Sequence, residues 1–355
     1  MRDDTLRAQR LRSHLLSTPA ATATDAAAHL LATQAQEFWA GRWALAARAD
    51  GAPTLTDVDA AFERGDLVRT WTQRGTLHIV PAADLPWVLE VTADRQQRAA
   101  AGVLRTHGIA PEDVDRAERL VGPALAGGNR LTRSEFADVL RAGGVDPARS
   151  RGNHILSALA VRGSLALGPV VPRVDGPTRD QYLVATGDLP TARAVAHPLA
   201  EMFVAYVRSH GPATVDDFRW WAGLPSGQAR LARDAAGERV TAVDEGVFVA
   251  GDTVEASGSA AGGVRALGPF DEYYLSYADR SGVCDPAAFA SIGPTLNGQV
   301  KPVIVADGRV VGVWSHSTAA GRHHLPPQPA LFDGESVPPD EVDAALARFS
   351  RFLAG

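Results

Sequence analysis

The feature that most constrains the fold is a pattern that occurs three times along the chain. Each time, a threonine followed three residues later by an acid opens a short amphipathic helix, and two strand-like runs come after it. The threonine and the acid form a capping box, in which each side chain satisfies a backbone N–H group of the first helical turn. The capping boxes are expected at Thr56 with Asp59, Thr132 with Glu135, and Thr214 with Asp217. Helices followed by a β-hairpin are the layout of a winged helix, so the sequence predicts three such motifs in tandem.

The strand-like runs define three expected hairpins. The first joins residues 67–72 to 76–80, the second joins 155–161 to 165–167, and the third joins 239–243 to 246–249. The motifs would then cover roughly residues 5–82, 112–172 and 198–250. The three segments share little sequence, so three unrelated helix–strand segments are the alternative interpretation.

Beyond residue 262 the pattern changes to that of a small β-domain. Residues 300–305 and 309–314 alternate around an Asp-Gly pair, which predicts a tight hairpin. Further strands are expected at 264–267 and near 271–277, and a last amphipathic helix at 341–353. The predicted fold class is α+β: three tandem winged helices, a C-terminal β-barrel-like region and a terminal helix. The expected domains are 1–95, which holds the candidate catalytic motif, 96–180, 181–262, and 263–355, which includes a Pro-rich linker.

Composition excludes several classes of protein. A single cysteine, Cys284, excludes an internal disulfide framework and a multi-cysteine metal site, and it fits a reducing cytoplasm. The pair His323-His324 has no third ligand at metal spacing, and no phosphate-cradling glycine loop is present. We therefore expect no metal and no cofactor. The sequence contains no run of about 18 apolar residues, so we expect no membrane span. The expected protein is a cytoplasmic, nucleoid-associated monomer.

The charge balance argues only weakly against a nucleic-acid partner. The net charge is −6, whereas general nucleic-acid binders are usually basic. A local positive face is still compatible with that value. Lys301 is the only lysine, so phosphate contacts would come from arginines, which bind phosphate bidentately.

Two glutamines that flank a small apolar residue, Gln34 and Gln36, are the first candidates for chemistry. Residues two apart share a face only in an extended segment. If both serve one site, the chain must break between a helix ending near Leu31 and one starting near Glu37, with Ala35 directed into the core. A glutamine carbonyl can accept a hydrogen bond from a water molecule and so orient the oxygen of that water. In the alternative, each glutamine bonds local backbone at a helix end.

The first hairpin carries the second group of candidates. Arg69, Arg74 and His78, with Trp71 between them, suit a ribbon that grips phosphate or enters a groove. The alternative is a solvated wing with a core tryptophan.

A third candidate segment, residues 268–280, is dense in acids and tyrosines. Asp271 and Tyr273 could support an active site by placing an acid near a reacting sugar. A structural pairing of an aspartate with an arginine is the alternative.

Taken in order, six segments resemble the winged-helix DNA glycosylase family of AlkZ and YcaQ. They are residues 6–11, 34–36, 67–71 with 74–78, 211–214, 270–273 and 308–314. The resemblance implies a tandem of three winged helices with a β-barrel-like region, and excision of N7-alkylated purines, including interstrand crosslinks. In the AlkZ-like branch the catalytic motif is Gln-apolar-Gln, which falls on Gln34, Ala35 and Gln36, whereas the YcaQ-like branch has an aspartate as its second polar residue. Gln73 stands where methionine is usual.

The expected function is a monofunctional glycosylase that acts on double-stranded DNA with alkylated purines, with self-resistance to an alkylating antibiotic as its setting. Crosslinked bases cannot swing into a deep pocket. We therefore expect Gln34 and Gln36 on a concave, solvent-open face. A non-catalytic DNA-binding protein, or one that sequesters the drug, is the alternative.

Overall fold

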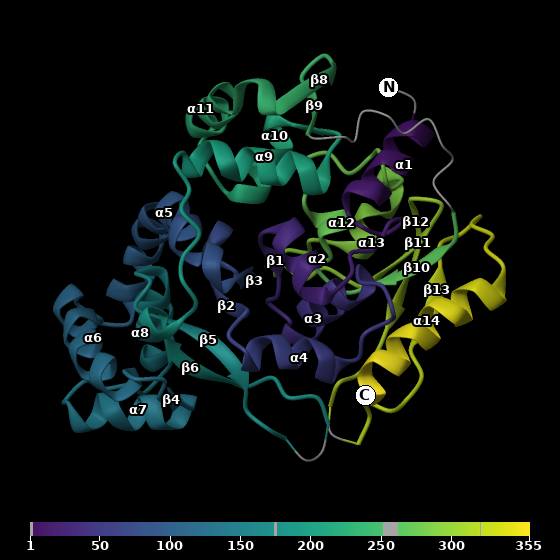
Figure 1. The fold of residues 1–355 in the computed structure, drawn as a ribbon. Helices are drawn as coiled ribbons and strands as arrows, with labels where there is room; N and C mark the ends of the chain where they lie inside the picture. The colour runs from purple at the N-terminus through teal and green to yellow at the C-terminus, as the bar shows by residue number, and fades with distance from the viewer. Residues whose placement is uncertain (1–2, 174–175, 251–261, 320) are drawn as a thin grey trace. The chain divides into compact units, whose positions relative to one another are not determined.

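The computed structural model describes residues 3–173, 176–250, 262–319 and 321–355, and these divide into two compact units. Unit 1 comprises Met1–Val58, Val174–Pro177 and Leu199–Gly355, and unit 2 comprises Asp59–Arg173 and Thr178–Pro198. Each unit combines helices with antiparallel strands (Figure 1), as the sequence predicted for the chain. Helix α4 (Leu55–Glu63) crosses the division.

Unit 2 is built on an antiparallel sheet flanked by helices. Its helices are α5 (Leu85–Thr106), α6 (Pro111–Leu125), α7 (Arg133–Ala142) and α8 (Arg151–Val161). Its strands are β2 (Leu67–Trp71), β3 (Leu77–Pro81), β4 (Arg130–Leu131), β5 (Leu165–Val170) and β6 (Gln181–Ala185). The strand order is β3-β2-β5-β6-β4. The hairpin β2-β3 therefore joins the hairpin β5-β6, with Arg69 opposite Leu167.

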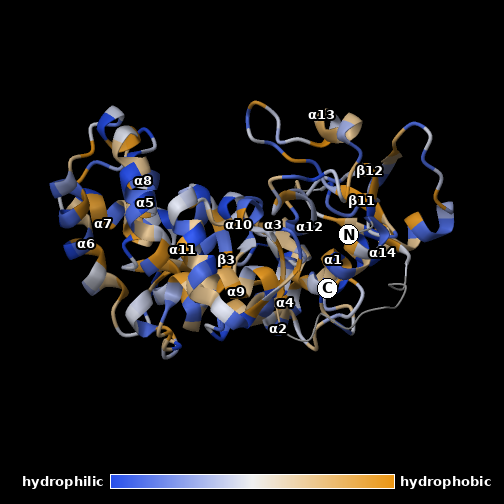
Figure 2. Cartoon of the chain, turned by 90° about the horizontal axis from the view of Figure 1, so that it is seen from above, coloured by the Kyte–Doolittle hydropathy of each residue, from blue (hydrophilic) through white to orange (hydrophobic). Residues whose placement is uncertain are grey.

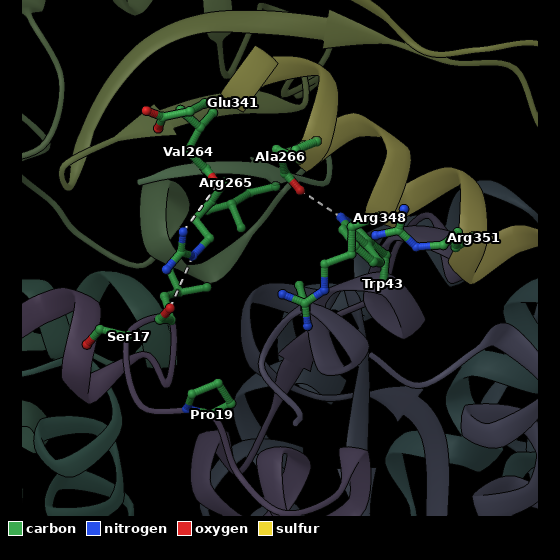
Figure 3. A pocket seen from close by; sticks show the side chains of 14 residues that line it. Ser17, Pro19, Trp43, Val264, Arg265, Ala266, Glu341, Arg348 and Arg351 are labelled. Atoms are coloured by element: carbon green, nitrogen blue, oxygen red, sulfur yellow. Dashed lines mark hydrogen bonds between the residues drawn. The ribbon is translucent and has the colours of Figure 1, made fainter. Parts of the chain in front are cut away.

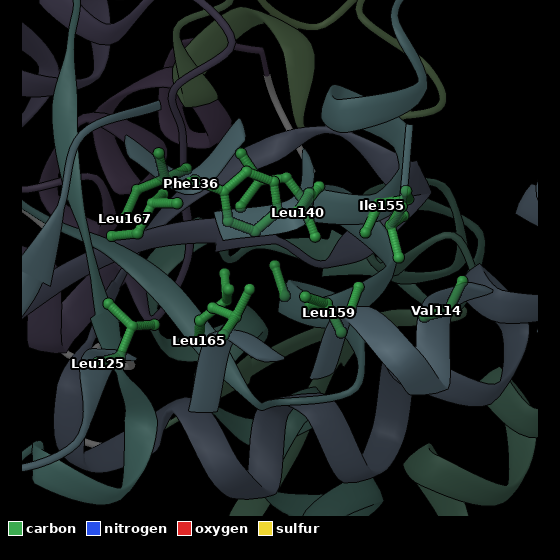
Figure 4. Close-up of a cluster of buried hydrophobic side chains, with 14 of the residues drawn as sticks. Val114, Leu125, Phe136, Leu140, Ile155, Leu159, Leu165 and Leu167 are labelled. Carbon is green, nitrogen blue, oxygen red and sulfur yellow. The ribbon is translucent and has the colours of Figure 1, made fainter. Parts of the chain in front are cut away.

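Apolar residues at helical spacing form the core of unit 2. In α6 the buried residues are Val114, Ala117, Val121 and Leu125, which recur every three or four positions. Figure 2 shows hydrophobic and hydrophilic residues interleaved along α6 and α7. The buried side chains of α6, α7 and α8 meet those of β5 (Figure 4), so one apolar cluster joins the helices to the sheet.

Unit 1 contains more numerous and shorter elements. Its helices are α1 (Asp3–Ser13), α2 (Ala23–Leu30), α3 (Phe38–Ala47), α9 (Pro198–His210), α10 (Val215–Ala222), α11 (Ser226–Ala236), α12 (Glu272–Leu275), α13 (Phe289–Ile292) and α14 (Pro339–Ala354). Its strands are β1 (Thr33–Gln34), β7 (Ala213–Thr214), β8 (Val240–Asp244), β9 (Val247–Ala250), β10 (Val264–Leu267), β11 (Val303–Ala306), β12 (Arg309–Ser315) and β13 (Gln328–Leu331). The strands β7, β9 and β8 form a separate sheet, in that order, and they come from the same part of the chain as α9, α10 and α11.

The C-terminal region of unit 1 confirms the Asp-Gly hairpin. Asp307 and Gly308 both have positive φ, 49° and 79°, as a two-residue turn of this kind requires. The predicted strand at 264–267 and the last helix are also confirmed. Helix α14 packs on β10 and α3, with the Phe349 ring centroid 4.8 Å from that of Trp314 and 5.3 Å from that of Trp43. Edge and tilted contacts of this kind are the favourable ones between aromatic rings.

The expected barrel-like closure is not found. Among the described residues the strands form an open sheet in the order β10-β11-β12-β13, with β10 and β13 at its edges. Part of the reason is that residues 272–275, expected as a strand, form helix α12 instead. The Asp271 carboxylate caps that helix by accepting a hydrogen bond from the Tyr273 N–H at 2.9 Å.

Two further expectations about local structure are wrong. Residues 155–161 belong to helix α8, since Ile155, Leu156, Leu159 and Ala160 share one helical face, and β5 pairs with β6 in their place. The first capping box uses Thr54 and Asp57 rather than Thr56 and Asp59, because the helix begins at Leu55. The boxes at Thr132 and Thr214 are confirmed.

Candidate active site

The Gln-Ala-Gln segment lies in a break between two helices, as predicted. Helix α2 ends at Leu30, residues Thr33–Gln34 are extended, and α3 begins at Phe38. Ala35 is 1% exposed, so it points into the core. The segment is thus not helical: Gln34 is extended and Gln36 lies in a bend before α3.

The break is produced by a strained turn at Leu31. Leu31 has φ 66° and ψ −52°, and the Ala32 N–H donates to the Leu30 carbonyl at 2.8 Å. This geometry is that of a classic γ-turn, which is rare and strained. A non-glycine residue persists in such a conformation only where its surroundings fix it, and strain of this kind concentrates at functional sites.

The two amides differ in their access to solvent. Gln36 is exposed, whereas Gln34 is only 5% exposed. The expectation that both side chains lie on an open face is therefore wrong for Gln34. The difference follows from its place in the short strand β1, where the neighbouring Thr33 is also buried.

A buried carboxylate holds the backbone of the motif. The Gln34 N–H donates to Glu272 Oε1 at 2.6 Å, and Glu272 is 1% exposed. Its Oε2 accepts hydrogen bonds from the Trp221 indole N–H at 3.1 Å and from the Ser276 hydroxyl. Sequence reasoning missed Glu272, although it adjoins the candidate Asp271.

His210 extends this network on the other side of Glu272. His210 Nε2 lies 3.4 Å from Glu272 Oε2, and the imidazole stacks on Tyr206 with ring centroids 4.8 Å apart. Burial lowers the pKa of His210, although the contact with Glu272 acts in the opposite direction. Its neighbour His14 is also buried and has a strongly lowered pKa for the same reason. Sequence reasoning did not identify His210.

Asp271 forms the arginine pairing that the sequence left open as an alternative. Its two oxygens accept from the Arg48 guanidinium at 2.7 and 3.0 Å, and both side chains are fully buried. Tyr273 is also buried, and its hydroxyl donates to the Gly308 carbonyl at 2.7 Å. Burial raises the pKa of Tyr273, so it remains a neutral donor. Both residues thus support the structure around Glu272.

The first hairpin places its candidate residues at different depths. Arg74, with φ 53°, lies in the turn, and it is only partly buried. Arg69 is 5% exposed and donates to Gln181 Oε1 at 3.3 Å, while His78 is fully buried with Nδ1 3.1 Å from the Thr72 hydroxyl. Trp71 packs against the core of unit 2. The turn therefore presents Arg74 more openly than the strands present Arg69 and His78.

Gln73, the departure from the usual methionine, is fully buried in this turn. Its amide nitrogen and oxygen have no hydrogen-bond partner among the described residues. A buried polar group without a partner destabilises the folded state. The site of Gln73 therefore suits an apolar side chain better than an amide.

A basic cavity of about 390 Å³ lies in unit 1 between α3, β10 and α14 (Figure 3). Arg265 donates to the Leu16 carbonyl at 3.1 Å, and Arg348 donates to those of Ala46 and Ala49, also at 3.1 Å. Arg265 thus links the residues after α1 to β10, and Arg348 links the C-terminal end of α3 to α14. None of the 14 lining residues belongs to the Gln-Ala-Gln segment.

The described residues offer neither a metal site nor a membrane-spanning helix. They contain no cluster of three or more histidine, cysteine, aspartate or glutamate side chains placed to hold a metal ion. No helix among them is long and apolar enough to cross a bilayer.

Comparison with known proteins identifies the class. A family model described as "DNA glycosylase AlkZ-like" matches residues 27–352, so the protein is a DNA glycosylase and DNA is its substrate. An "Interstrand DNA cross-link repair glycosylase" from Streptomyces sahachiroi is 30% identical over 314 residues, which cover 82% of each chain. The solved structure of Streptomyces sahachiroi DNA glycosylase AlkZ matches with a TM-score of 0.77 and 26% identity, covering 99% of this chain and 96% of the other. The chain belongs to the AlkZ-like DNA glycosylase family, which confirms the resemblance seen in the sequence.

Proposed function

We propose that this glycosylase hydrolyses the N-glycosidic bond of cationic N7-alkylpurines and unhooks interstrand crosslinks. The observation that carries the proposal is the non-helical Gln-Ala-Gln segment between α2 and α3, with Gln36 exposed. The crosslink-repair name of the Streptomyces sahachiroi relative supports the second half of the proposal. Self-resistance to an alkylating antibiotic is the setting that such a substrate suggests.

A cationic base needs little help to leave. Alkylation at N7 gives the base a positive charge, so its glycosidic bond is already weakened and the leaving group needs no protonation. The remaining task is to stabilise an oxocarbenium-like sugar and to place a water at C1′. The amide carbonyls of Gln34 and Gln36 can accept a hydrogen bond from the attacking water, which releases its proton to solvent, and can direct their dipoles toward the developing charge. A neutral base would instead require a carboxylic acid.

The reaction is proposed to stop at an abasic site. Strand cleavage through a Schiff base needs an amine nucleophile, and the chain has a single lysine, Lys301, between α13 and β11. We therefore assign a monofunctional hydrolase.

We assign binding of the DNA duplex to winged-helix modules within residues 1–95, 96–180 and 181–262. The capping boxes at Thr132 and Thr214 and the hairpins β2-β3 and β8-β9 support this assignment, whereas in the hairpin β5-β6 the strand β6 lies beyond residue 180. Residues 251–261 lie outside the described chain. In the first module Arg74, at the hairpin turn, is the best placed phosphate contact. Arg69, Trp71 and His78 would shape the ribbon that carries it.

The test is base release from three DNAs. Wild type and the double variant Gln34→Ala/Gln36→Ala are incubated with N7-methylguanine DNA, crosslinked DNA and plain DNA, and abasic sites are assayed. We expect release from the two alkylated substrates, and loss of release in the double variant by at least about 100-fold, the usual scale for a group acting in the transition state. A double variant as fast as wild type contradicts the assignment. Binding of DNA or drug by wild type without base release would favour a non-catalytic role.

A further inference from the structure

Glu272 contacts the backbone of the motif directly. Glu272 Oε1 accepts the Gln34 N–H at 2.6 Å, which is short for an N–H···O hydrogen bond. That N–H belongs to the residue that carries one of the two proposed catalytic amides. A contact at this point fixes the peptide plane from which the Gln34 side chain departs.

Glu272 is itself fixed by its neighbours. Trp221 on α10 donates to Oε2 at 3.1 Å, Ser276 donates to the same oxygen, and the preceding residue Asp271 is locked by the Arg48 guanidinium. Its rotamer is therefore set by contacts from two different parts of unit 1.

The consecutive residues Asp271 and Glu272 contact the chain on either side of helix α3. Asp271 binds Arg48, which follows α3 and folds back to donate to the Ala44 carbonyl at 3.0 Å. Glu272 binds Gln34, which precedes α3. On the other side of Gln34, the γ-turn at Leu31 is in a conformation that needs outside support. Glu272 thus contacts the segment between the strained turn and α3 at its first glutamine.

We propose that Glu272 is a positioning residue of the glycosylase, which sets the backbone of the Gln-Ala-Gln segment and thereby the direction of its amides. The proposal rests on the catalytic role proposed for Gln34 and Gln36. Displacement of a catalytic group by about 1 Å can cost about 100-fold in rate. Loss of the hydrogen bond should therefore affect the chemical step and leave DNA binding intact.

Three substitutions of Glu272 should weaken its hydrogen bond with the Gln34 N–H to different degrees. Glu272→Ala removes the acceptor. Glu272→Asp shortens the side chain by one bond of about 1.5 Å, so the carboxylate no longer reaches the Gln34 N–H. Glu272→Gln keeps an acceptor oxygen but sets its NH₂ group against the Trp221 N–H. Tyr274→Phe is the matched control, because it removes one hydrogen bond from the same short helix, to the Gly293 carbonyl, away from the motif.

The measurements are the single-turnover rate of N7-methylguanine release, the Kd for the same DNA, and the Tm of each variant. We expect the rate to fall by about 10- to 100-fold for Glu272→Ala and Glu272→Asp, and less for Glu272→Gln. The Kd should stay within about twofold of wild type, and Tyr274→Phe should keep the wild-type rate.

A double-mutant cycle separates positioning from a general structural role. In the Gln34→Ala/Gln36→Ala background, Glu272→Ala should slow the residual reaction no further, since it acts only through the missing amides. An equal loss in both backgrounds, or a wild-type rate in folded Glu272→Ala, overturns the proposal. If Glu272→Ala does not fold, the same cycle with Glu272→Gln decides. A wild-type rate in the glutamine double variant would instead overturn the proposed function, and the positioning role with it.

Discussion

Two buried polar regions of the molecule are built in opposite ways. In unit 1, each of the four carboxylate oxygens of Asp271 and Glu272 accepts at least one hydrogen bond. In unit 2, the Gln73 amide has no partner for either of its polar atoms among the described residues. Burial of polar groups is favourable only when their hydrogen bonds are satisfied. The first region is thus a support that fixes the Gln-Ala-Gln segment, and the second lowers the stability of the hairpin turn that holds it.

The largest effect should come from breaking the buried ion pair of the satisfied region. Arg48→Met leaves Asp271 buried and uncompensated, so we expect a loss of about 3–5 kcal/mol in the free energy of unfolding. Denaturant titration measures it. Arg64→Met is the control, because the Arg64–Asp66 pair is largely exposed and such pairs contribute about 0–1 kcal/mol. Equal losses in the two variants would refute the contrast.

A second prediction concerns pH in the same unit. Burial lowers the pKa of His29, on α2, from its usual 6.5 to about 4. The unfolded chain therefore binds the proton first, and His29 contributes stability above pH 6.5 that is lost as the pH falls toward 4. The total is about 3 kcal/mol, at about 1.4 kcal/mol per unit. Unfolding measured from pH 7 to 4 should show a shallower decline in His29→Gln, and an unchanged slope would exclude this role.

The unsatisfied region should respond in the other direction. Gln73→Met replaces the buried amide with an unbranched apolar side chain of similar shape. We expect the free energy of unfolding to rise by about 1–3 kcal/mol, which is the penalty of an unpaired buried polar group. The gain should be the same at every pH, since an amide does not titrate. A lower Tm in Gln73→Met would show that the amide has a partner in solution.

The smallest expected effect concerns the helix cap at Thr132, which both the sequence and the structure identify. We expect this cap to contribute the stability that is usual for such caps. Thr132→Ala removes the side-chain cap of α7, whose oxygen accepts the Glu135 N–H at 3.2 Å. The expected loss is about 1 kcal/mol in the free energy of unfolding. Thr132→Ser, which keeps the hydroxyl, should lie close to wild type. A loss as large as that of Arg48→Met would mean that the cap supports more than its helix.

The sequence was most informative where the signal is local. The helix break around Gln34, the Asp307-Gly308 turn and the box at Thr132 each depend on a few adjacent residues, and they were predicted correctly. The box at Thr56 failed because Thr54 and Asp57 offer the same spacing two residues earlier. Residues 155–161 were assigned to a strand because a short apolar run fits either structure.

The candidate site was harder to predict because its support is made by distant residues. Glu272 and Gln34 are 238 positions apart, and His210 and Glu272 are 62 apart. No spacing rule connects such residues, so only the acid-rich character of residues 268–280 indicated that the region matters. The burial of Gln34 could not be predicted for the same reason, since it depends on what folds over the segment.

The joining of β2 to β5 has a mechanical consequence for the two hairpins β2-β3 and β5-β6 of unit 2. Neither hairpin can separate from the other without breaking ladder hydrogen bonds beside Arg69 and Leu167. Their backbone amides should consequently exchange with deuterium as one cooperative block rather than as two. A force on the turn of the first hairpin would therefore be resisted by the second hairpin as well.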